Sequence, residues 1–450
     1  MKPRYLALLL IILCRCHATY AATNSLDPAQ LAYNLKTTVE AYEKAGRKNP
    51  KWDGDVKRCF TIFSRMRSWT NDVPSELFQD LRTNVARIVG VGCDDPMIRY
   101  LHLRFVDTHT LAEAVLAYGD SASALQKSEY PDIRKFYATM WSRKALLLSE
   151  QQRPEVTVML TTAASYLANA LADTSMPQKE ADQACDLLMS ASWWAEPARW
   201  NCYHTLETVL TNRWNGSSVA LLTKGRAYLS YAWQARGIGY SGSVSVNGWK
   251  LMTERLNIGA EALEAAWNLD PHDVRICQEM MRVELGQGKG RKRLEMWFQR
   301  GMKVDPANHD LCGEKMEYLR PRWYGSIKEM IDFGRECTTN TNWADSVRLM
   351  LADAHYEASR EIQDDRKRAS YWRQTNVWSD VQFAFEQFFK QYPDAVDYRH
   401  NYARYAALCG KWQEFLNQVR MFPSTNYPYF GGVERFDKML KTAEEQVKKQ

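Results

Sequence analysis

The chain has 450 residues, of which 45% are hydrophobic and 25% are charged, with a formal net charge of +6. This length exceeds one compact core, so we expect several globular units or one extended repeat array, and the composition is that of an ordinary folded protein. Glycine (22 residues) and proline (15 residues) are sparse, which argues against a turn-rich β-sandwich and for long helices joined by short connections.

The N-terminal segment 1–21 predicts a secretory signal peptide. Lys2 and Arg4 form a basic start, residues 5–13 are apolar without interruption, and Ala21 stands at the expected cleavage point. The apolar run is far shorter than the roughly 20 residues that a bilayer span needs. Cleavage removes three basic residues and no acidic one, which takes the net charge from +6 to +3. We therefore expect an exported protein, periplasmic or secreted, with no integral membrane segment and no electrostatic reason to bind nucleic acid.

Helical spacing of apolar residues dominates the rest of the chain. Residues 22–216 show it on periodicity alone, and clear i, i+3, i+4 stripes occupy 219–236, 249–269 and 378–389. No run of alternating apolar and polar residues is long enough to predict a strand.

Two interruptions set the expected domain boundaries. A glycine–serine stretch near 216–218 breaks the helical pattern, and a polar stretch near 364–376 forms a softer joint. We expect an N-terminal helical domain over 22–216, a tetratricopeptide-like region over 217–363 and a C-terminal helical repeat region over 364–450.

Prolines recur where predicted helices end. Pro271 and Pro306 lie about 35 positions apart, and Pro393 follows a further helix. Proline fits there because it stops one helix and can start the next. A period near 34 residues with proline at each boundary is typical of a helix–turn–helix repeat. The sequence therefore predicts an all-α fold, built as an α-solenoid of stacked helical hairpins.

The stretch 393–419 resembles a tetratricopeptide repeat. Pro393 matches the closing proline of that repeat, Ala403 the small residue where its two helices touch, and Gly410 the turn between the helices. Phe415 departs from the pattern, because the family prefers alanine there, and we expect it to splay the hairpin locally. The resemblance implies a right-handed solenoid.

The turn Arg320–Ser326 reads Arg-Pro-Arg-Trp-Tyr-Gly-Ser, and a second distinctive stretch runs from Ala235 through Trp249 to Pro271. Both resemble an uncharacterised bacterial family, the domain of unknown function 4034. The resemblance covers mainly 225–340 and implies a helical fold in a secreted or envelope protein, without an established reaction. We take five residues of these stretches as the candidate interaction surface: Arg322, Trp323, Tyr324, Tyr240 and Trp249.

Residues 237–242 fit the pattern GxGxxG letter for letter. A dinucleotide site needs a strand before this pattern and a helix directly after it. Here a predicted helix precedes the pattern and a loop follows it. We therefore expect an irregular loop, itself a candidate functional segment, and no nucleotide cofactor.

Histidines and basic runs predict no further site. His102 with His109, and His204 with Glu207, lack the spacing that places two imidazoles on one helical face. The basic run 289–293 has no interleaved aromatic residues of the kind that stack on nucleic-acid bases. We therefore expect no metal ion, no cofactor, no nucleic-acid partner and no catalytic residues.

Eight cysteines follow the predicted cleavage point, and none lies in a CxxC pair. In an exported protein an even number of cysteines permits disulfides. Cys312 and Cys337 are the pair that one helical hairpin could bring face to face. The alternative is that they are buried free thiols, as most cysteines of large helical proteins are.

These features predict a non-enzymatic scaffold that grips another envelope or secreted protein, or a peptide, with its stacked hairpins. The alternative is a glycan-binding or cell-wall-active helical protein, in which tryptophans stack on sugar rings. Four tryptophans would form that platform, unless they are core residues, as tryptophans at helical spacing usually are: Trp193, Trp194, Trp200 and Trp214.

Overall fold

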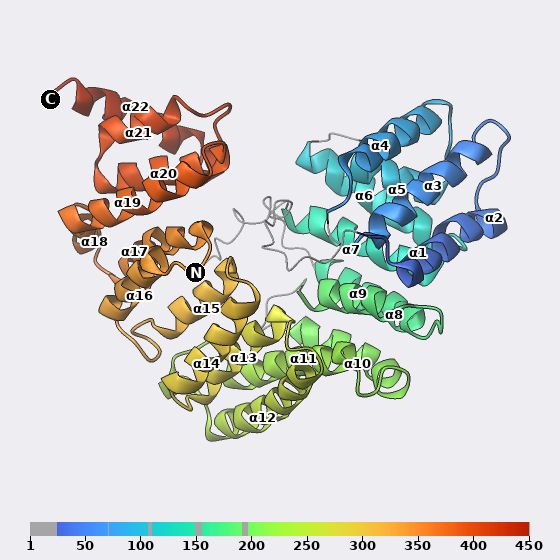
Figure 1. Ribbon diagram of the computed structural model, residues 1–450, viewed down its shortest axis with the longest axis horizontal. Helices are drawn as coiled ribbons and strands as arrows, with labels where there is room; N and C mark the ends of the chain where they lie inside the picture. Colours follow the sequence, from blue (N-terminus) through green and yellow to red (C-terminus); the bar gives the residue numbers. More distant parts are fainter. Residues whose placement is uncertain (1–24, 71, 107–109, 149–154, 191–196, 450) are drawn as a thin grey trace. The chain divides into compact units, whose positions relative to one another are not determined.

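The computed structural model describes residues 25–70, 72–106, 110–148, 155–190 and 197–449 of the chain (Figure 1). All regular elements of these residues are helical, apart from a single antiparallel bridge between Leu26 and Trp69. The all-α prediction is therefore confirmed. The predicted signal peptide over 1–21 lies outside the described residues. None of the described helices is both long and apolar enough to cross a membrane.

The chain divides into two compact units, and the division falls between Pro271 and His272. The N-terminal unit contains α1 (Pro28–Leu35), a π-helical turn η1 (Lys36–Glu40), α2 (Ala41–Ala45), α3 (Asp53–Ser68), α4 (Ser75–Gly90), α5 (Pro96–Phe105), α6 (Leu111–Gln126), α7 (Asp132–Leu148), α8 (Glu155–Leu171), α9 (Gln178–Ser190), α10 (Pro197–Asn212), α11 (Ser218–Arg236), a 3-10 turn η2 (Ser241–Ser243) and α12 (Val246–Leu269). The expected boundary near 216–218 is the turn between α10 and α11, inside this unit.

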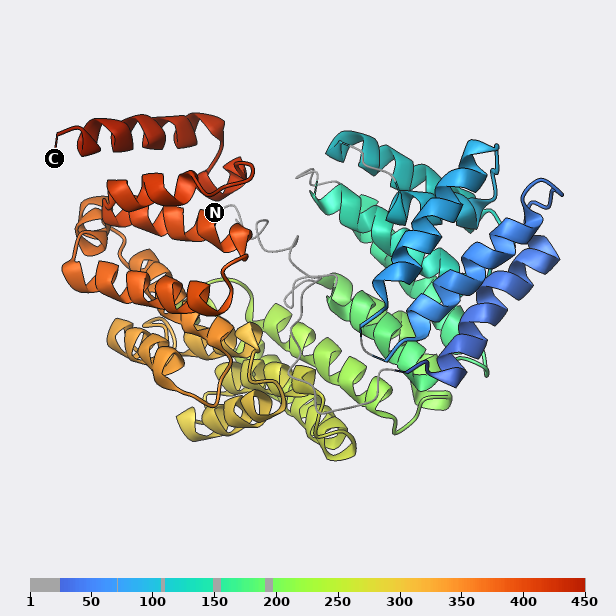
Figure 2. The same ribbon diagram turned by 45° about the horizontal axis from the view of Figure 1, so that its top comes forward.

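The C-terminal unit contains α13 (Val274–Gln287), α14 (Arg291–Val304), α15 (His309–Tyr318), α16 (Ile327–Thr339), a 3-10 turn η3 (Asp345–Leu349), α17 (Met350–Glu361), α18 (Asp365–Trp372), α19 (Thr375–Gln391), α20 (Val396–Cys409), α21 (Trp412–Val419), η4 (Tyr427–Phe430) and α22 (Val433–Val447). Within each unit, helices that follow one another in the sequence mostly pack side by side (Figure 1 and Figure 2). This arrangement of hairpins is compatible with the predicted solenoid.

A buried carboxylate fixes where α5 begins. Asp95 is fully buried and caps the helix by accepting hydrogen bonds from the backbone N–H groups of Met97 (3.0 Å) and Ile98 (3.3 Å). It also accepts hydrogen bonds from the backbone N–H of Arg47 (3.0 Å) and from the hydroxyl of Tyr130 (3.0 Å). One side chain therefore ties α5 to the segment before α3 and to the segment before α7.

Helices α11 and α12 form the longest hairpin of the N-terminal unit. Glycines let their backbones approach, because a Cβ atom on Gly225 would lie 2.5 Å from Leu263 and one on Gly259 would lie 3.3 Å from the Gly225 carbonyl oxygen. The hydroxyl of Ser217 caps the start of α11, and Gly237 ends the helix with a φ of 75°. Gly237 therefore marks the point where the loop that joins the two helices begins.

The hairpin of α13 and α14 follows the predicted proline spacing. Asp273 caps α13 through the backbone N–H of Arg275, and Gly288 ends the helix in the left-handed region with a φ of 62°. Pro271 and Pro306 both lie in turns between helices. The prediction of a helix–turn–helix unit between these prolines is confirmed.

The hairpin of α20 and α21 carries the tetratricopeptide resemblance. Gly410 ends α20 with a φ of 72°, and Ala403 is fully buried. Phe415 is also fully buried, and its ring packs 6.3 Å from that of Phe430 and 6.2 Å from that of Phe436. The elements that follow the hairpin therefore accommodate the Phe415 ring.

Candidate functional site

The loop between α11 and α12 is held in shape by its own polar groups. We call residues 237–249 the apolar loop. The guanidinium of Arg236 donates hydrogen bonds to the carbonyl oxygens of Gly237 (3.1 Å) and Gly239 (2.9 Å). The hydroxyl of Ser245 accepts a hydrogen bond from the backbone N–H of Gly248 (3.0 Å) and so caps α12. The loop is therefore preorganised, and its side chains are presented from a fixed backbone.

The apolar loop exposes large hydrophobic side chains to solvent. Ile238 is 94% exposed, Tyr240 is 85% exposed and Val246 is 88% exposed, while Trp249 at the start of α12 is 38% exposed. Single exposed apolar residues are common, but here four lie within 237–249, a stretch that contains no charged residue and in which serines and an asparagine separate them. Two of the five residues expected on the interaction surface, Tyr240 and Trp249, therefore lie together here.

The GxGxxG pattern falls within the apolar loop. Residues 237–242 follow helix α11 and lead into the 3-10 turn η2, so no strand precedes them. The backbone geometry of a dinucleotide fingerprint, a strand followed by this turn and a helix, does not occur at this position.

The other three expected surface residues lie in the turn between α15 and α16, in the C-terminal unit. Arg322 pairs with Glu317, and its side chain is 49% exposed. The indole N–H of Trp323 donates to the same carboxylate (2.8 Å), and the hydroxyl of Tyr324 donates to the carbonyl oxygen of Leu285 (3.2 Å). These contacts hold the turn against its own unit, although Tyr324 remains 46% exposed.

Sequence reasoning missed the residue that anchors this turn. The side chain of Arg320 is 7% exposed and pairs with Glu317 (3.1 Å), Glu357 (3.0 Å) and Glu361 (2.6 Å). It therefore joins the end of α15 to α17. A Cβ atom on Gly325 would lie 2.3 Å from the Leu319 carbonyl oxygen, so the turn also needs a glycine at that position. The arginine at 320 and the glycine at 325 therefore both have structural roles in this turn.

A cavity of about 80 Å³ lies between α3, α5 and α7 of the N-terminal unit. Each of these helices contributes one arginine to its lining: Arg67, Arg104 and Arg134. We call it the arginine cavity. Its other walls are apolar or aromatic, and consist of Phe63, Met97, Tyr100, Phe105, Tyr137 and Trp141.

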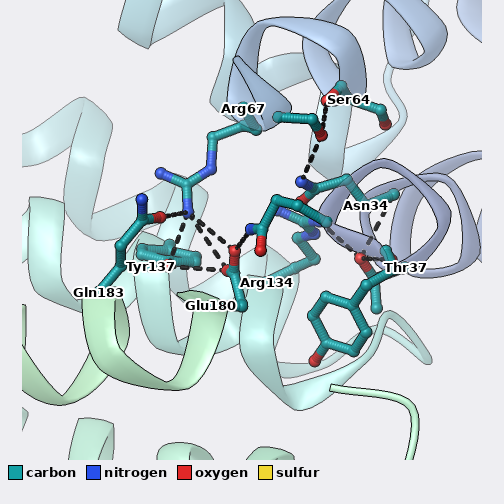
Figure 3. A network of polar contacts seen from close by, with 11 residues as sticks. Asn34, Thr37, Ser64, Arg67, Arg134, Tyr137, Glu180 and Gln183 are labelled. Atoms are coloured by element: carbon teal, nitrogen blue, oxygen red, sulfur yellow. Dashed lines mark hydrogen bonds and ion pairs between the residues drawn. The ribbon is translucent and has the colours of Figure 1, made fainter. Parts of the chain in front are cut away.

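A buried carboxylate on α9 joins this cavity to the surrounding helices (Figure 3). Glu180 is fully buried, and its Oε1 accepts hydrogen bonds from the hydroxyl of Tyr137 (2.8 Å) and from Nη2 of Arg67 (3.2 Å). The amide of Gln30 donates to the other oxygen. Nη2 of Arg67 also donates to Tyr137 (2.8 Å) and to Gln183 (3.3 Å). Helices α1, α3, α7 and α9 therefore meet in one polar network.

The network keeps Glu180 ionised. Burial raises the pKa of its carboxyl, but the positive charges of Arg67 and Arg134 and the hydrogen bonds outweigh burial, so the pKa lies below its ordinary value. Burial lowers the pKa of Arg134, whose Nη2 donates to Asn34 (2.8 Å) and Thr37 (2.5 Å). Sequence reasoning did not single out these residues, because they lie on separate helices and form no local motif.

A second buried polar row ties helices of the C-terminal unit together. His355 of α17 is 1% exposed, and its ring nitrogens lie 2.7 Å from the Tyr371 hydroxyl and 3.1 Å from an Asp380 carboxylate oxygen. Arg335 pairs with the same carboxylate (2.9 Å). Burial and the charge of Asp380 raise the pKa of Tyr371, so its hydroxyl keeps its proton. The row joins α16, α17, α18 and α19.

The remaining sequence candidates are placed as follows. His204 is an exposed partner of Glu207 (3.2 Å), whereas His109 lies outside the described residues. Across the described part of the chain, no group of three or more His, Cys, Asp and Glu side chains is placed to hold a metal ion. Trp214 is buried and donates to the Leu171 carbonyl oxygen (3.0 Å). Trp200 is half-buried and stacks on Tyr231 with ring centres 4.0 Å apart, and Trp193 and Trp194 lie outside the described residues.

Cys312 of α15 and Cys337 of α16 are neighbouring buried free thiols. Burial, together with the hydrogen-bond contact between the two thiols, raises the pKa of Cys337 far above its ordinary value. The thiolate is the reactive form of cysteine, so Cys337 is unreactive in the folded chain. The proximity of the two thiols agrees with the expected pairing, and the disulfide itself stays a prediction.

Two-step alkylation tests the state of these thiols. We expect iodoacetamide at mildly alkaline pH to leave the eight described cysteines of the folded chain unlabelled, because all are buried. After unfolding without a reductant, labelling of Cys312 and Cys337 identifies free thiols, whereas labelling only after reduction identifies the disulfide. Rapid labelling of either residue in the folded chain would contradict the burial described here.

No protein-family model matches the chain, and no curated protein sequence is significantly similar to it.

Proposed function

We propose that the chain is an exported helical-repeat protein of the tetratricopeptide-like kind, which binds another envelope or secreted protein, or a peptide, without catalysing a reaction. The apolar loop is the proposed contact surface. The observation that carries the proposal is the exposure of Ile238, Tyr240 and Val246, each 85% or more, from a backbone that polar groups hold in place.

Exposed apolar side chains favour association with a partner. Large apolar side chains in water gain free energy when a partner covers them, at roughly 25 cal/mol per Å² of apolar surface. A preorganised loop also loses less conformational entropy on binding than a flexible one. Ile238 and Tyr240 therefore favour association with an apolar patch on another chain. Trp249 lies at the edge of this segment, and its ring centre is 5.8 Å from the guanidinium carbon of Arg236.

Replacement of the loop side chains tests this proposal. In the double variant Ile238→Ser, Tyr240→Ser, we expect the stability to change by less than about 0.5 kcal/mol, because both side chains are exposed. Capture of the partner from an envelope extract should fall at least about tenfold, the change that corresponds to 1.4 kcal/mol of binding free energy.

The matched control is Leu116→Ser, Val158→Ser, which removes two other apolar side chains of the same unit that are 71% and 62% exposed. It should capture the partner as the unmodified chain does. Equal capture by both double variants would contradict the proposal. Binding of cell-wall oligosaccharides that is lost on Trp200→Leu would instead support the alternative of a glycan-binding protein.

A further inference from the structure

The arginine cavity contains more positive charge than negative charge. Arg67, Arg104 and Arg134 line it; Glu180 forms an ion pair with Arg67 (3.2 Å), and its charge also acts on Arg134. Arg134 is 1% exposed, so water solvates its charge poorly. A buried charge without an opposite partner is unfavourable. The positive charges of the three arginines that line the cavity therefore outnumber the negative charge of the neighbouring Glu180.

Several N–H groups at the cavity also lack acceptors. The Nε atoms of Arg67 and Arg134 are buried, and neither has a hydrogen-bond partner among the protein atoms described. Arg104 forms no ion pair with any described residue, and its guanidinium lies 3.2 Å from the ring centre of Trp141. A guanidinium presents five N–H donors in a planar fork that matches the oxygens of carboxylate and phosphate groups.

The pKa of a neighbouring lysine, Lys144, is consistent with excess positive charge at the cavity. Burial and the charge of Arg104 lower the pKa of Lys144, whose ammonium lies 4.6 Å from the ring centre of Trp141. The side chain of Arg67 is 28% exposed, so solvent reaches the edge of the cavity. About 80 Å³ is room for an acid group with a short organic body, or for several waters, since one water needs roughly 10–15 Å³ of such space.

We propose that the arginine cavity binds a small oxyanion, either a carboxylate or a phosphate group, whose charge is neutralised by Arg67, Arg104 and Arg134. The aromatic walls formed by Phe63 and Trp141 favour an oxyanion with a flat apolar body. This site lies apart from the apolar loop in the sequence and does not depend on the proposed partner-binding function.

Calorimetric titration of the full chain tests the site. The probes are benzoate, acetate and inorganic phosphate, each against chloride at the same ionic strength. We expect saturable binding of one equivalent of at least one oxyanion, and among the carboxylates tighter binding of benzoate than of acetate. Binding of phosphate alone assigns the site to phosphate groups, and binding of benzoate alone assigns it to carboxylates. Equal weak heats from all three probes and from chloride would show that the cavity contains only water, and would overturn the proposal.

Variants at two arginines locate the binding. Arg104→Met should weaken the affinity at least about tenfold, because it removes a charged fork that forms no ion pair with the described fold. Arg58→Met, on α3 with a side chain that is 61% exposed, should leave the affinity unchanged. Equal affinities of the two variants would place the bound anion elsewhere and overturn the assignment.

A third variant should strengthen the effect of the bound oxyanion, whereas Arg104→Met should weaken it. Glu180→Gln removes the carboxylate that competes for Arg67, so the bound oxyanion should raise the melting temperature of this variant more than that of the unmodified chain. A purely structural role of the arginines would give equal shifts in the two proteins.

Discussion

Replacing Glu180 with glutamine should lower the free energy of unfolding of the N-terminal unit by roughly 3–5 kcal/mol, the range observed when one partner of a buried ion pair is removed. The substitution keeps the size of the side chain and removes its charge. Arg134, which is buried, and Arg67, whose side chain is 28% exposed, then retain their charges without this neighbouring carboxylate. Denaturant unfolding, with hydrogen exchange of α7 and α9 peptides to identify the unit that opens, measures this loss.

The control for this prediction is Glu254→Gln, the same chemical change at a side chain that is 54% exposed. Its effect should stay within about 0.5 kcal/mol, because exposed ion pairs contribute little. A loss of similar size in both variants would show that the charge of Glu180 is not the cause.

The difference in stability between the unmodified chain and Glu180→Gln should depend on pH. The pKa of Glu180 lies below its ordinary value in the folded chain, so its contribution to stability is present at neutral pH and is lost as the pH falls through the folded-state pKa. The unmodified chain and Glu180→Gln should therefore converge in stability below the ordinary pH range of glutamate titration. A constant difference between them down to strongly acidic pH would contradict the ion pairing.

Replacing Arg320 with methionine is the second large effect that we expect. The change keeps an apolar stem of similar length but leaves Glu317, Glu357 and Glu361 without their shared cation. The expected loss of stability in the C-terminal unit is roughly 2–4 kcal/mol, lower than for a fully buried pair because these carboxylates keep 16–30% of their exposure. Denaturant unfolding followed by hydrogen exchange of α15 and α17 measures it.

Arg322→Met is the matched control in the same turn. Its side chain pairs with Glu317 but is 49% exposed, so the loss should stay below about 1 kcal/mol. If Arg322→Met destabilised the unit as much as Arg320→Met does, the anchoring role of Arg320 would be wrong.

The sequence predicted those parts of the fold that depend on local chemistry. Apolar stripes predicted the helices, and Gly410 marked the end of α20, where the backbone enters the left-handed region. The prolines at 271 and 306 marked the turns. These signals are local because a helix begins and ends according to residues within one turn of its ends.

The candidate sites were only partly predictable. Tyr240 and Trp249 were singled out in a glycine-rich stretch between two apolar stripes, and both are exposed, while their role in binding stays a prediction. The arginine cavity was not, because Arg67 and Arg134 acquire their roles only when α3, α7 and α9 pack together. Arg320 was named as the start of a distinctive turn, but its anchoring role was not predicted, since its carboxylate partners on α17 lie far along the chain from the turn.

The most direct test of the proposed binding function is photo-crosslinking from the apolar loop. A photoreactive benzoylphenylalanine replaces Tyr240 in one protein and Leu116 in another, and each is irradiated in the envelope extract. Both positions are strongly exposed in the same unit, at 85% and 71% respectively. The account predicts one discrete protein adduct from position 240 and none from position 116. Adducts from neither position, or the same adducts from both, would contradict it.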